Sequence, residues 1–230
     1  MARDPISAFT PISALGAAAR VLRETPPPPL PVLPPLPDLH YDPVDDAALA
    51  AITDLYREIM PAGGAILDVM SSWMPHLPPE IAYRRVAGIG KDPCVLAENP
   101  FLDEWRVRDL NTDPALPFAS GEFDGAAMCG AIQHLTRPSE VIREIGRVLK
   151  PDAPLVVTFS QRCVATKAIA CWCLLDDAAQ LCLVARHFVD AGNFTDIRCI
   201  DRTPPSETGG GVPLYAVIGL SRGTAYGDHD

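Results

Sequence analysis

One short apolar run constrains the fold of this 230-residue chain more than any other stretch. It extends from Ala65 to Val69, follows the turn signal Pro-Ala-Gly-Gly at residues 61–64, and contains a single acid, Asp68. A short apolar run after a Gly-Gly turn is typical of a strand buried in a parallel sheet. An acid at the carboxyl end of such a strand lies where open α/β sheets bind their ligands. The run therefore predicts an α/β fold with a binding site beside Asp68.

Six further segments are interpreted as strands, some as apolar runs and others, such as residues 105–111, with charged residues among the apolar ones. They cover residues 84–90, 105–111, 123–129, 154–159, 194–200 and 214–220. Helical patterns separate most of these runs. We expect the helices over residues 45–60, from Pro93, from Arg137, and over residues 168–191 with a stop at Gly192.

The composition limits the classes of function. The net charge is −10, which argues against a nucleic acid as partner, because nucleic-acid-binding proteins present basic faces. No apolar run approaches the roughly 20 residues that a membrane span needs. The N-terminus carries Asp4 and Pro5 and lacks the apolar core of a secretory signal. The seven cysteines show no metal-ligand spacing, so we expect no metal and reduced thiols in a cytoplasmic protein.

The N-terminal residues 1–40 differ from the rest of the chain. A short helix is expected around residues 12–23, and the proline-rich residues 25–37 favour an extended polyproline II strap. The strap is either a docking segment for a partner with an aromatic groove or a linker that lies on the domain surface. We expect the folded domain over residues 41–221 and a mobile polar tail over residues 222–230.

The motifs taken together resemble the class I S-adenosylmethionine-dependent methyltransferases. Leu-Asp-Val at residues 67–69 is similar to the first motif of that superfamily, but Met70, Ser72 and Met74 stand in the places of its three glycines. Residues 147–159 are close to the superfamily's Arg-Val-Leu-Lys-Pro-Gly-Gly and the strand that follows. The Met-Ser-Ser-Trp loop, the later His-Leu-Pro, Gly-x-Gly and Asp-Leu-Asn resemble a type 11 methyltransferase-like branch. The resemblance covers about Tyr41 to Ile218.

This resemblance implies a fold, a cofactor and a reaction. The fold is Rossmann-like, with a mostly parallel seven-stranded sheet whose last strand is antiparallel. The cofactor is S-adenosylmethionine. The reaction is methyl transfer from its sulfonium to a nucleophilic O, N, S or C of a small-molecule acceptor in secondary metabolism, by in-line placement of the two reactants. A homo-oligomer is compatible with the sequence.

The resemblance also implies which residues contact the cofactor. The loop at residues 70–72 supplies backbone amides to the methionine moiety, and Gly90 holds the place of the usual ribose-binding acid. Asp92 either caps the next helix or supplies the missing ribose acceptor. Asp109 either faces the adenine amino group or only forms a turn. The full expected set is Asp68, Met70, Ser71, Ser72, Gly88, Gly90, Asp92, Asp109, Leu110, Cys129 and Gly130.

Two residues are candidates for catalysis. His134 is a candidate general base, because its reference pKa near 6.5 suits proton removal at neutral pH; its other interpretation is a packing or capping role. Arg162 is a candidate clamp for an anionic substrate group, unless it only pairs with a neighbouring carboxylate. Further substrate contacts are expected from Trp73, Gln133, Lys167 and Trp172.

Cys171 and Cys173 flank Trp172. A metal or arsenical site there is conceivable, but two thiols two residues apart on a helix point in different directions, which favours packing. Two other functions stay open for the whole chain, because a fold does not fix a function. One is a non-methylating reaction such as cyclisation or isomerisation, and the other is a non-catalytic binding partner.

Overall fold

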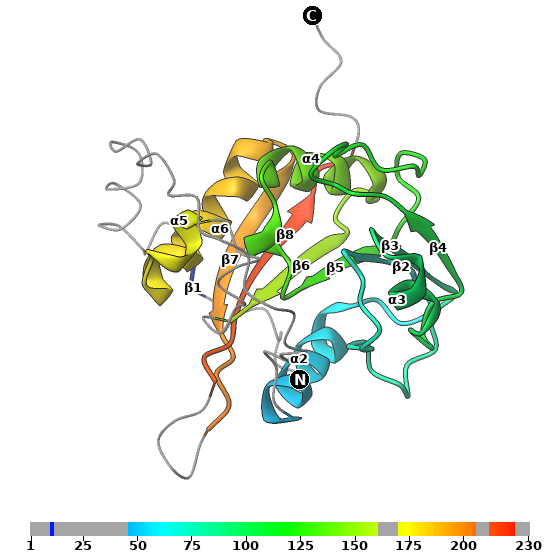
Figure 1. Ribbon diagram of the computed structural model, residues 1–230, viewed down its shortest axis with the longest axis horizontal. Coiled ribbons are helices and arrows are strands. Elements are labelled where there is room, and N and C mark those ends of the chain that lie inside the picture. The colour runs from blue at the N-terminus through cyan, green and yellow to red at the C-terminus, as the bar shows by residue number, and fades with distance from the viewer. Residues whose placement is uncertain (1–9, 12–45, 161–169, 206–211, 224–230) are drawn as a thin grey trace, which may run out of the picture.

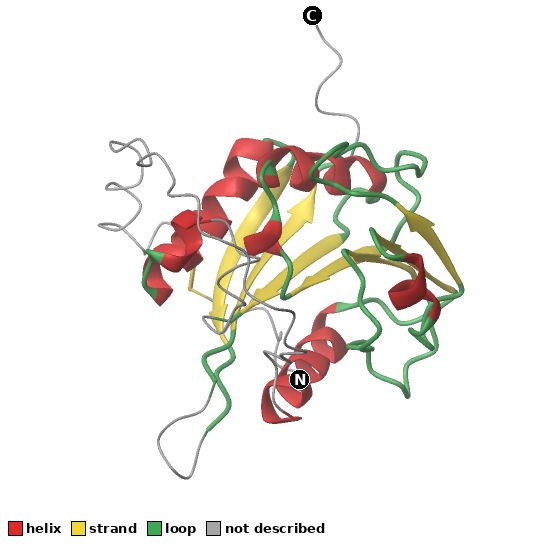
Figure 2. Ribbon diagram, in the orientation of Figure 1, coloured by secondary structure: helices red, strands yellow, loops and turns green. Residues whose placement is uncertain are grey.

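The computed structural model describes residues 10–11, 46–160, 170–205 and 212–223, and an eight-stranded sheet forms the centre of these residues (Figures 1 and 2). The strand order is β1-β7-β8-β6-β5-β2-β3-β4. The strands are β1 (Thr10–Pro11), β2 (Ala65–Val69), β3 (Arg85–Gly90), β4 (Glu104–Val107), β5 (Gly125–Cys129), β6 (Pro154–Phe159), β7 (Phe194–Asp201) and β8 (Tyr215–Ser221).

The centre of the sheet is parallel. β2 pairs in parallel with β3 and β5, and the pairs β3–β4 and β5–β6 continue the parallel arrangement on both sides. β8 runs antiparallel to both β6 and β7. The predicted mostly parallel sheet with an antiparallel last strand is therefore confirmed. β1, which pairs with the outer edge of β7, is an eighth strand of two residues that the sequence analysis did not predict.

Helices cover both faces of the sheet, as Figure 1 shows. α4 and α6 lie together on one face, where their apolar sides join the larger core cluster. α2 lies on the opposite face and contributes its buried side chains to a second cluster. None of the helices in the described part is long and apolar enough to cross a membrane. The helices are α2 (Asp46–Ile59), α3 (Pro93–Ala97), α4 (Pro138–Val148), α5 (Ala170–Cys173) and α6 (Asp177–Ala191), with a 3-10 turn, η3 (Ile132–His134).

Two predicted elements differ from the structure, each for a local reason. The strand expected over residues 105–111 ends at Val107, because Asp109 begins a turn in which its carboxylate accepts from the Asn111 N–H at 2.9 Å. The helix expected over residues 168–191 is divided into α5 and α6, since Asp176 is extended and caps α6 through the Ala179 N–H at 2.8 Å. The helix predicted over residues 12–23 and the proline-rich residues 25–37 lie outside the described residues.

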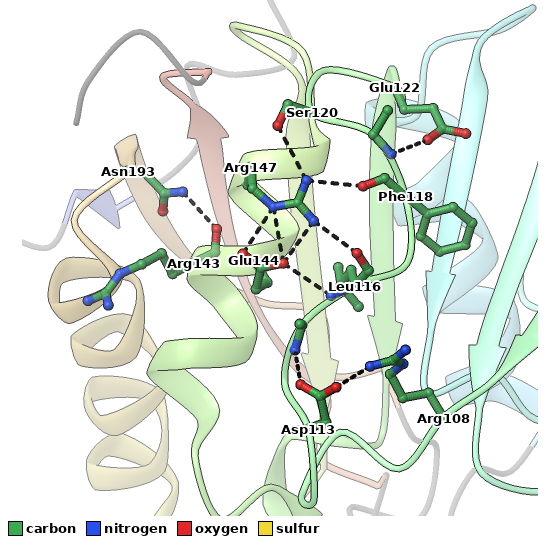
Figure 3. Close-up of polar contacts among 12 residues, drawn as sticks. Arg108, Asp113, Leu116, Phe118, Ser120, Glu122, Arg143, Glu144, Arg147 and Asn193 are labelled. Atoms are coloured by element: carbon green, nitrogen blue, oxygen red, sulfur yellow. Dashed lines mark hydrogen bonds and ion pairs between the residues drawn. The ribbon is translucent and has the colours of Figure 1, made fainter. Parts of the chain in front are cut away.

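Arg147 on α4 holds the long connection between β4 and β5 (Figure 3). Its guanidinium donates to the carbonyls of Phe118 at 3.0 Å and Leu116 at 2.9 Å, and to Glu144 at 2.8 Å. Glu144 in turn accepts from the Leu116 N–H at 3.1 Å. Burial acts to raise the pKa of Glu144, but the bonds from Arg147 and Leu116 outweigh it and leave the pKa below its ordinary value. The connection is thus tied to α4 by charge-assisted bonds.

We expect Arg147→Lys to lower the free energy of unfolding by about 1–3 kcal/mol, because a lysine cannot reproduce the planar fork that meets two carbonyls and a carboxylate at once. Urea denaturation measures the change. Arg186→Lys is the matched control, since Arg186 forms an exposed pair with Asp190 at 2.7 Å, and its effect should stay within about 0.5 kcal/mol. Equal losses in the two variants would contradict the role given to Arg147.

Candidate functional site

A pocket of about 460 Å³ lies at the carboxyl ends of β2, β3 and β4. This volume is in the range of roughly 300–1,000 Å³ that is usual for small-molecule sites, and the position is the one where open α/β sheets bind ligands. The lining residues come from the end of β3, from the segments that follow the three strands, α3 included, and from η3. They are Met70, Ser71, Gly90, Lys91, Asp92, Val95, Arg108, Asp109, Leu110, Asn111 and His134.

Asp68 lies directly behind this pocket. Its neighbours in register are the small residues Gly88 on β3 and Ala127 on β5. The Ser71 hydroxyl, which belongs to the pocket lining, donates to Asp68 Oδ2 at 2.5 Å. Burial raises the pKa of Asp68, while the Ser71 bond and the nearby charge of His76 act in the opposite direction. A carboxylate with a raised pKa therefore stands next to the lining without being part of it.

The loop after β2 keeps a glycine-like backbone without a glycine. Met70, in the place of the first glycine of the superfamily motif, has a φ of 56° in the left-handed region. Asn99, which follows α3 in the chain, holds the next two residues. Its amide donates to the Ser72 carbonyl at 2.8 Å and to the Ser71 hydroxyl at 3.3 Å. The Ser71 N–H donates to the Ile89 carbonyl at 2.9 Å. Asn99 was missed because no sequence motif links it to this loop.

The two glycines predicted on β3 have different surroundings. Gly90 lines the pocket, and a Cβ there would lie 3.1 Å from the Ser71 carbonyl oxygen. Gly88 does not line the pocket, and a Cβ there would lie 2.5 Å from a methyl group of Leu102. Gly90 therefore permits a close approach beside the pocket, whereas Gly88 permits the packing of Leu102 against the sheet.

Asp92 combines the two interpretations that the sequence left open. It caps α3 by accepting from the N–H groups of Cys94 at 2.9 Å and Val95 at 3.4 Å. Both bonds end on Oδ1, so the cap leaves the other carboxylate oxygen, Oδ2, for a further partner. Since Asp92 also lines the pocket, capping and ligand contact are compatible.

The residues after β4 connect two sides of the pocket. Asp109 both forms its predicted turn and lines the pocket. Asn111 donates to the His134 carbonyl at 2.9 Å and accepts from the Thr136 N–H at 2.7 Å, so it joins the loop after β4 to the loop after β5. Two lining cations, Lys91 and Arg108, were not predicted, and Arg108 forms an ion pair with Asp113 (Figure 3). Their signal in the sequence is weak, because charged loop residues are common.

The loop after β5 brings His134 to the pocket. Gly130 has a φ of 58°, and its carbonyl accepts from Gln133 Nε2 at 2.7 Å. Gln133 is buried, and its Oε1 has no partner among the described residues. Cys129 and Gly130 do not line the pocket. Cys129 lies instead near Tyr56, a buried phenol whose hydroxyl is 3.4 Å from Thr158 Oγ1.

The structure thus brings together seven of the predicted site residues in one pocket. They are Met70, Ser71, Gly90, Asp92, Asp109, Leu110 and His134. Asp68, Ser72, Gly88, Cys129, Gly130 and Gln133 lie on the same strands and loops but outside the lining.

The remaining predicted residues lie elsewhere. Trp73 follows the β2 loop and is 52% exposed, whereas Trp172 is buried and packs edge-on against Phe159 at 5.3 Å. Arg162 and Lys167 lie outside the described residues. Cys173 is exposed, and within the described ranges no three His, Cys, Asp or Glu residues are grouped so as to hold a metal ion.

Known proteins resemble this chain in its fold. The family model described as "Methyltransferase domain" matches residues 91–157. No match was found among curated protein sequences. Three solved structures illustrate the likeness, all at low identity, so that they inform on the fold alone.

The first is a chain from the complex of a Haloferax volcanii Trm112 methyltransferase activator with a putative methyltransferase, at 15% identity and a TM-score of 0.57, covering 78% of this chain and 91% of that one. The second is the [4+2]-cyclase SpnF, at 18% identity and a TM-score of 0.57, covering 79% of this chain and 85% of that one. The third is a putative S-adenosylmethionine-dependent methyltransferase from Listeria monocytogenes, at 10% identity and a TM-score of 0.55, covering 77% of this chain and 99% of that one.

Apart from the short β1, the described sheet consists of six parallel strands and one antiparallel strand, which is inserted between the last two parallel ones in the order β4-β3-β2-β5-β6-β8-β7. Together with the matched segment, this topology confirms the resemblance found in the sequence: the chain has the fold of the class I S-adenosylmethionine-dependent methyltransferase superfamily.

Proposed function

We propose that the pocket binds S-adenosylmethionine and that the protein transfers its methyl group to a small-molecule acceptor. One observation carries the proposal: at one edge of a sheet with this topology, the acids Asp92 and Asp109 line the same pocket as the β2 loop. Carboxylates accept hydrogen bonds from ribose hydroxyls and from an adenine amino group. The cytoplasm and secondary metabolism remain our expectations for where and in which process the protein acts.

The lining residues fit the parts of this cofactor. Asp109 and Leu110 would hold the adenine, and Asp92 Oδ2 would accept from the ribose. The backbone at residues 70–72 would face the methionine moiety, with Gly90 leaving room between these two regions. When bound, the cofactor supplies an electrophilic methyl group. This chain's residues position the two reactants and remove a proton where the acceptor requires it.

The acceptor would lie on the side of η3. His134 reaches the pocket there, and Gln133 presents a buried amide oxygen without a partner in the described part of the chain. We propose His134 as the general base and Gln133 as a contact to the acceptor. Arg162 and Lys167 follow β6 in the sequence and remain predicted contacts, as does Trp73.

A second candidate function keeps the pocket and changes the reaction. The Met70–Ser72 loop departs from the superfamily's glycines, which favours a reaction such as cyclisation or isomerisation. A structural neighbour described as a [4+2]-cyclase shares this fold. A non-catalytic role with a partner chain is the third alternative, and another neighbour occurs in a complex with a methyltransferase activator. Transfer of a labelled methyl group to an acceptor separates the first function from both others.

Binding of the cofactor is the primary test. Isothermal titration of the full chain with S-adenosylmethionine or its demethylated product should give a saturable heat, and Asp109→Asn should weaken binding about tenfold, because a charge-assisted hydrogen bond to the adenine amino group is lost. Asp54→Asn is a charge-matched control, since Asp54 is exposed on α2 and forms an ion pair with Arg57, outside the pocket lining. The absence of heat with both ligands, together with an unchanged melting temperature, would refute the proposal.

The affinity for S-adenosylmethionine should rise with pH through the titration of Asp68. Burial raises the pKa of this carboxyl, and a cationic ligand favours its ionised form, so binding is strong above the pKa and is lost as the pH falls through it. Asp68→Asn should weaken binding and flatten the profile, as measured by the dissociation constant from about pH 5 to 8. Asp54→Asn again serves as the control. A parent profile that is already flat would show that Asp68 does not act on the ligand.

His134→Ala should lower turnover by about 100-fold while leaving the cofactor dissociation constant within about threefold, because a base acts only in the chemical step. Transfer of a labelled methyl group to an accepted small molecule gives the turnover. His76→Ala is a useful comparison, because His76 lies near Asp68 and outside the pocket lining. Turnover equal to that of the parent across neutral pH would mean that proximity alone drives transfer.

A further inference from the structure

Four contacts join five residues in series at the carboxyl edge of the sheet, beyond the pocket described above. Phe159, the last residue of β6, is the register partner of Tyr215, the first residue of β8, and their rings lie 6.1 Å apart. Phe159 also packs edge-on against Trp172 of α5 at 5.3 Å. The two remaining members, Asp177 and Gln180, come from the first turn of α6.

Hydrogen bonds connect the two residues of α6 to Trp172 and Tyr215. Gln180 Nε2 donates to the Trp172 carbonyl at 3.1 Å, and the Tyr215 hydroxyl donates to Asp177 Oδ2 at 2.8 Å. Asp177 and Gln180 are three residues apart on α6 and therefore share one face of the helix. We call these five residues the Phe159 ring. The four contacts run in the order Gln180, Trp172, Phe159, Tyr215 and Asp177, and both ends of this series lie on α6. The members come from four elements spread over 57 residues of sequence, from 159 to 215.

Three buried polar atoms of the Phe159 ring have no hydrogen-bond partner among the residues that the structure describes. They are the indole nitrogen Nε1 of Trp172, Oε1 of Gln180 and Oδ1 of Asp177. Trp172 and Gln180 are each only 1% exposed. Burying an unpaired polar atom costs about 1–3 kcal/mol, so three among five neighbouring residues are unusual outside a binding site. The unpaired set offers one donor, the indole N–H, and two acceptors.

The charges of the ring select the ligand class. Asp177 is a carboxylate that no cation among the described residues pairs with, and Asp176 and Asp201 add negative charge nearby. Burial, together with Asp177 and Asp201, raises the pKa of Tyr215 to about 12, so its hydroxyl stays a neutral donor. Three aromatic rings beside a carboxylate are the surroundings in which proteins hold ammonium groups. A carboxylate ligand would be repelled.

We propose that the Phe159 ring is a binding site for the ammonium group of a small amine-bearing molecule, which donates to Asp177 Oδ1 and Gln180 Oε1. Asp177 and Tyr215 are half-buried whereas the other three members are buried, so the ligand enters between these two. A hydrogen-bond acceptor next to the amine would meet the Trp172 N–H. This assignment rests on the proposed function: the methyl acceptor is an amine, which is held at the end of β6, the strand next to β5.

Trp172 supplies the reporter for a direct test. The chain has three tryptophans, of which Trp73 and Trp105 are 52% and 39% exposed. In the full chain carrying W73F and W105F, the emission comes from Trp172 alone. The probes are 2-phenylethylamine, 2-phenylethanol and 3-phenylpropanoate, which share a ring and differ in the charge of the terminal group. We expect the amine to bind about tenfold more tightly than the alcohol and the carboxylate to bind least.

Two charge-matched variants complete this experiment. Asp177→Asn should remove the preference for the amine, whereas Asp176→Asn should keep it, since Asp176 lies one residue away and an asparagine still caps α6. Equal affinities for the three probes, a loss of preference in both variants, or no response to any probe would overturn the inference; the last result would mean that only ordered water meets the unpaired atoms.

The same samples separate this inference from the proposed function. Titration of the parent and of Asp177→Asn with the demethylated cofactor tests the pocket independently of the ring and checks that the variant is folded. A parent that binds the demethylated cofactor but shows no preference for the amine would refute the ring and leave the cofactor site. A parent that prefers the amine but does not bind the cofactor would refute the cofactor site and leave the ring.

Discussion

A parallel sheet that is covered by helices on both faces leaves almost no place for a polar side chain, and this constraint arranges the whole molecule. In the central strands β2, β5 and β6, the polar residues Asp68, Cys129 and Thr158 occur only in the last two positions. Elsewhere along these strands an unpaired polar atom would face the apolar clusters of α4 and α6 or of α2, at a cost of a few kcal/mol. Chemistry is therefore confined to the carboxyl edge, where both the pocket and the Phe159 ring lie.

The same constraint decides which elements could be predicted from the sequence. The strands 65–69 and 154–159 were predicted with their observed bounds, because burial on both faces produces continuous apolar runs with sharp ends. β4 was predicted too long, since an edge strand with exposed side chains has no such run and ends through a turn at Asp109. The division of α5 from α6 depends on a single cap at Asp176, and the apolar pattern continues across it.

The candidate site was predicted in part for a related reason. Acids at strand ends, such as Asp92 and Asp109, are visible because they interrupt an apolar pattern. The contacts that organise them are not visible: Asn99 supports the β2 loop from 27 residues away in the sequence, and Asn111 joins two loops through His134 and Thr136. The five members of the Phe159 ring likewise meet only in the folded chain, through the antiparallel register of β6 and β8.

The strained backbone at Met70 indicates what the β2 loop must preserve. A non-glycine residue at a φ of 56° costs about 1 kcal/mol or more, and such strain persists only where its surroundings enforce it. Here the enforcing contacts are those of Asn99 with Ser71 and Ser72 and that of Ser71 with Asp68. A glycine at position 70 would adopt the same backbone without this cost. The loop therefore holds a backbone conformation that favours glycine while a methionine stands at the pocket, so that the departure from glycine changes the surface that a ligand meets.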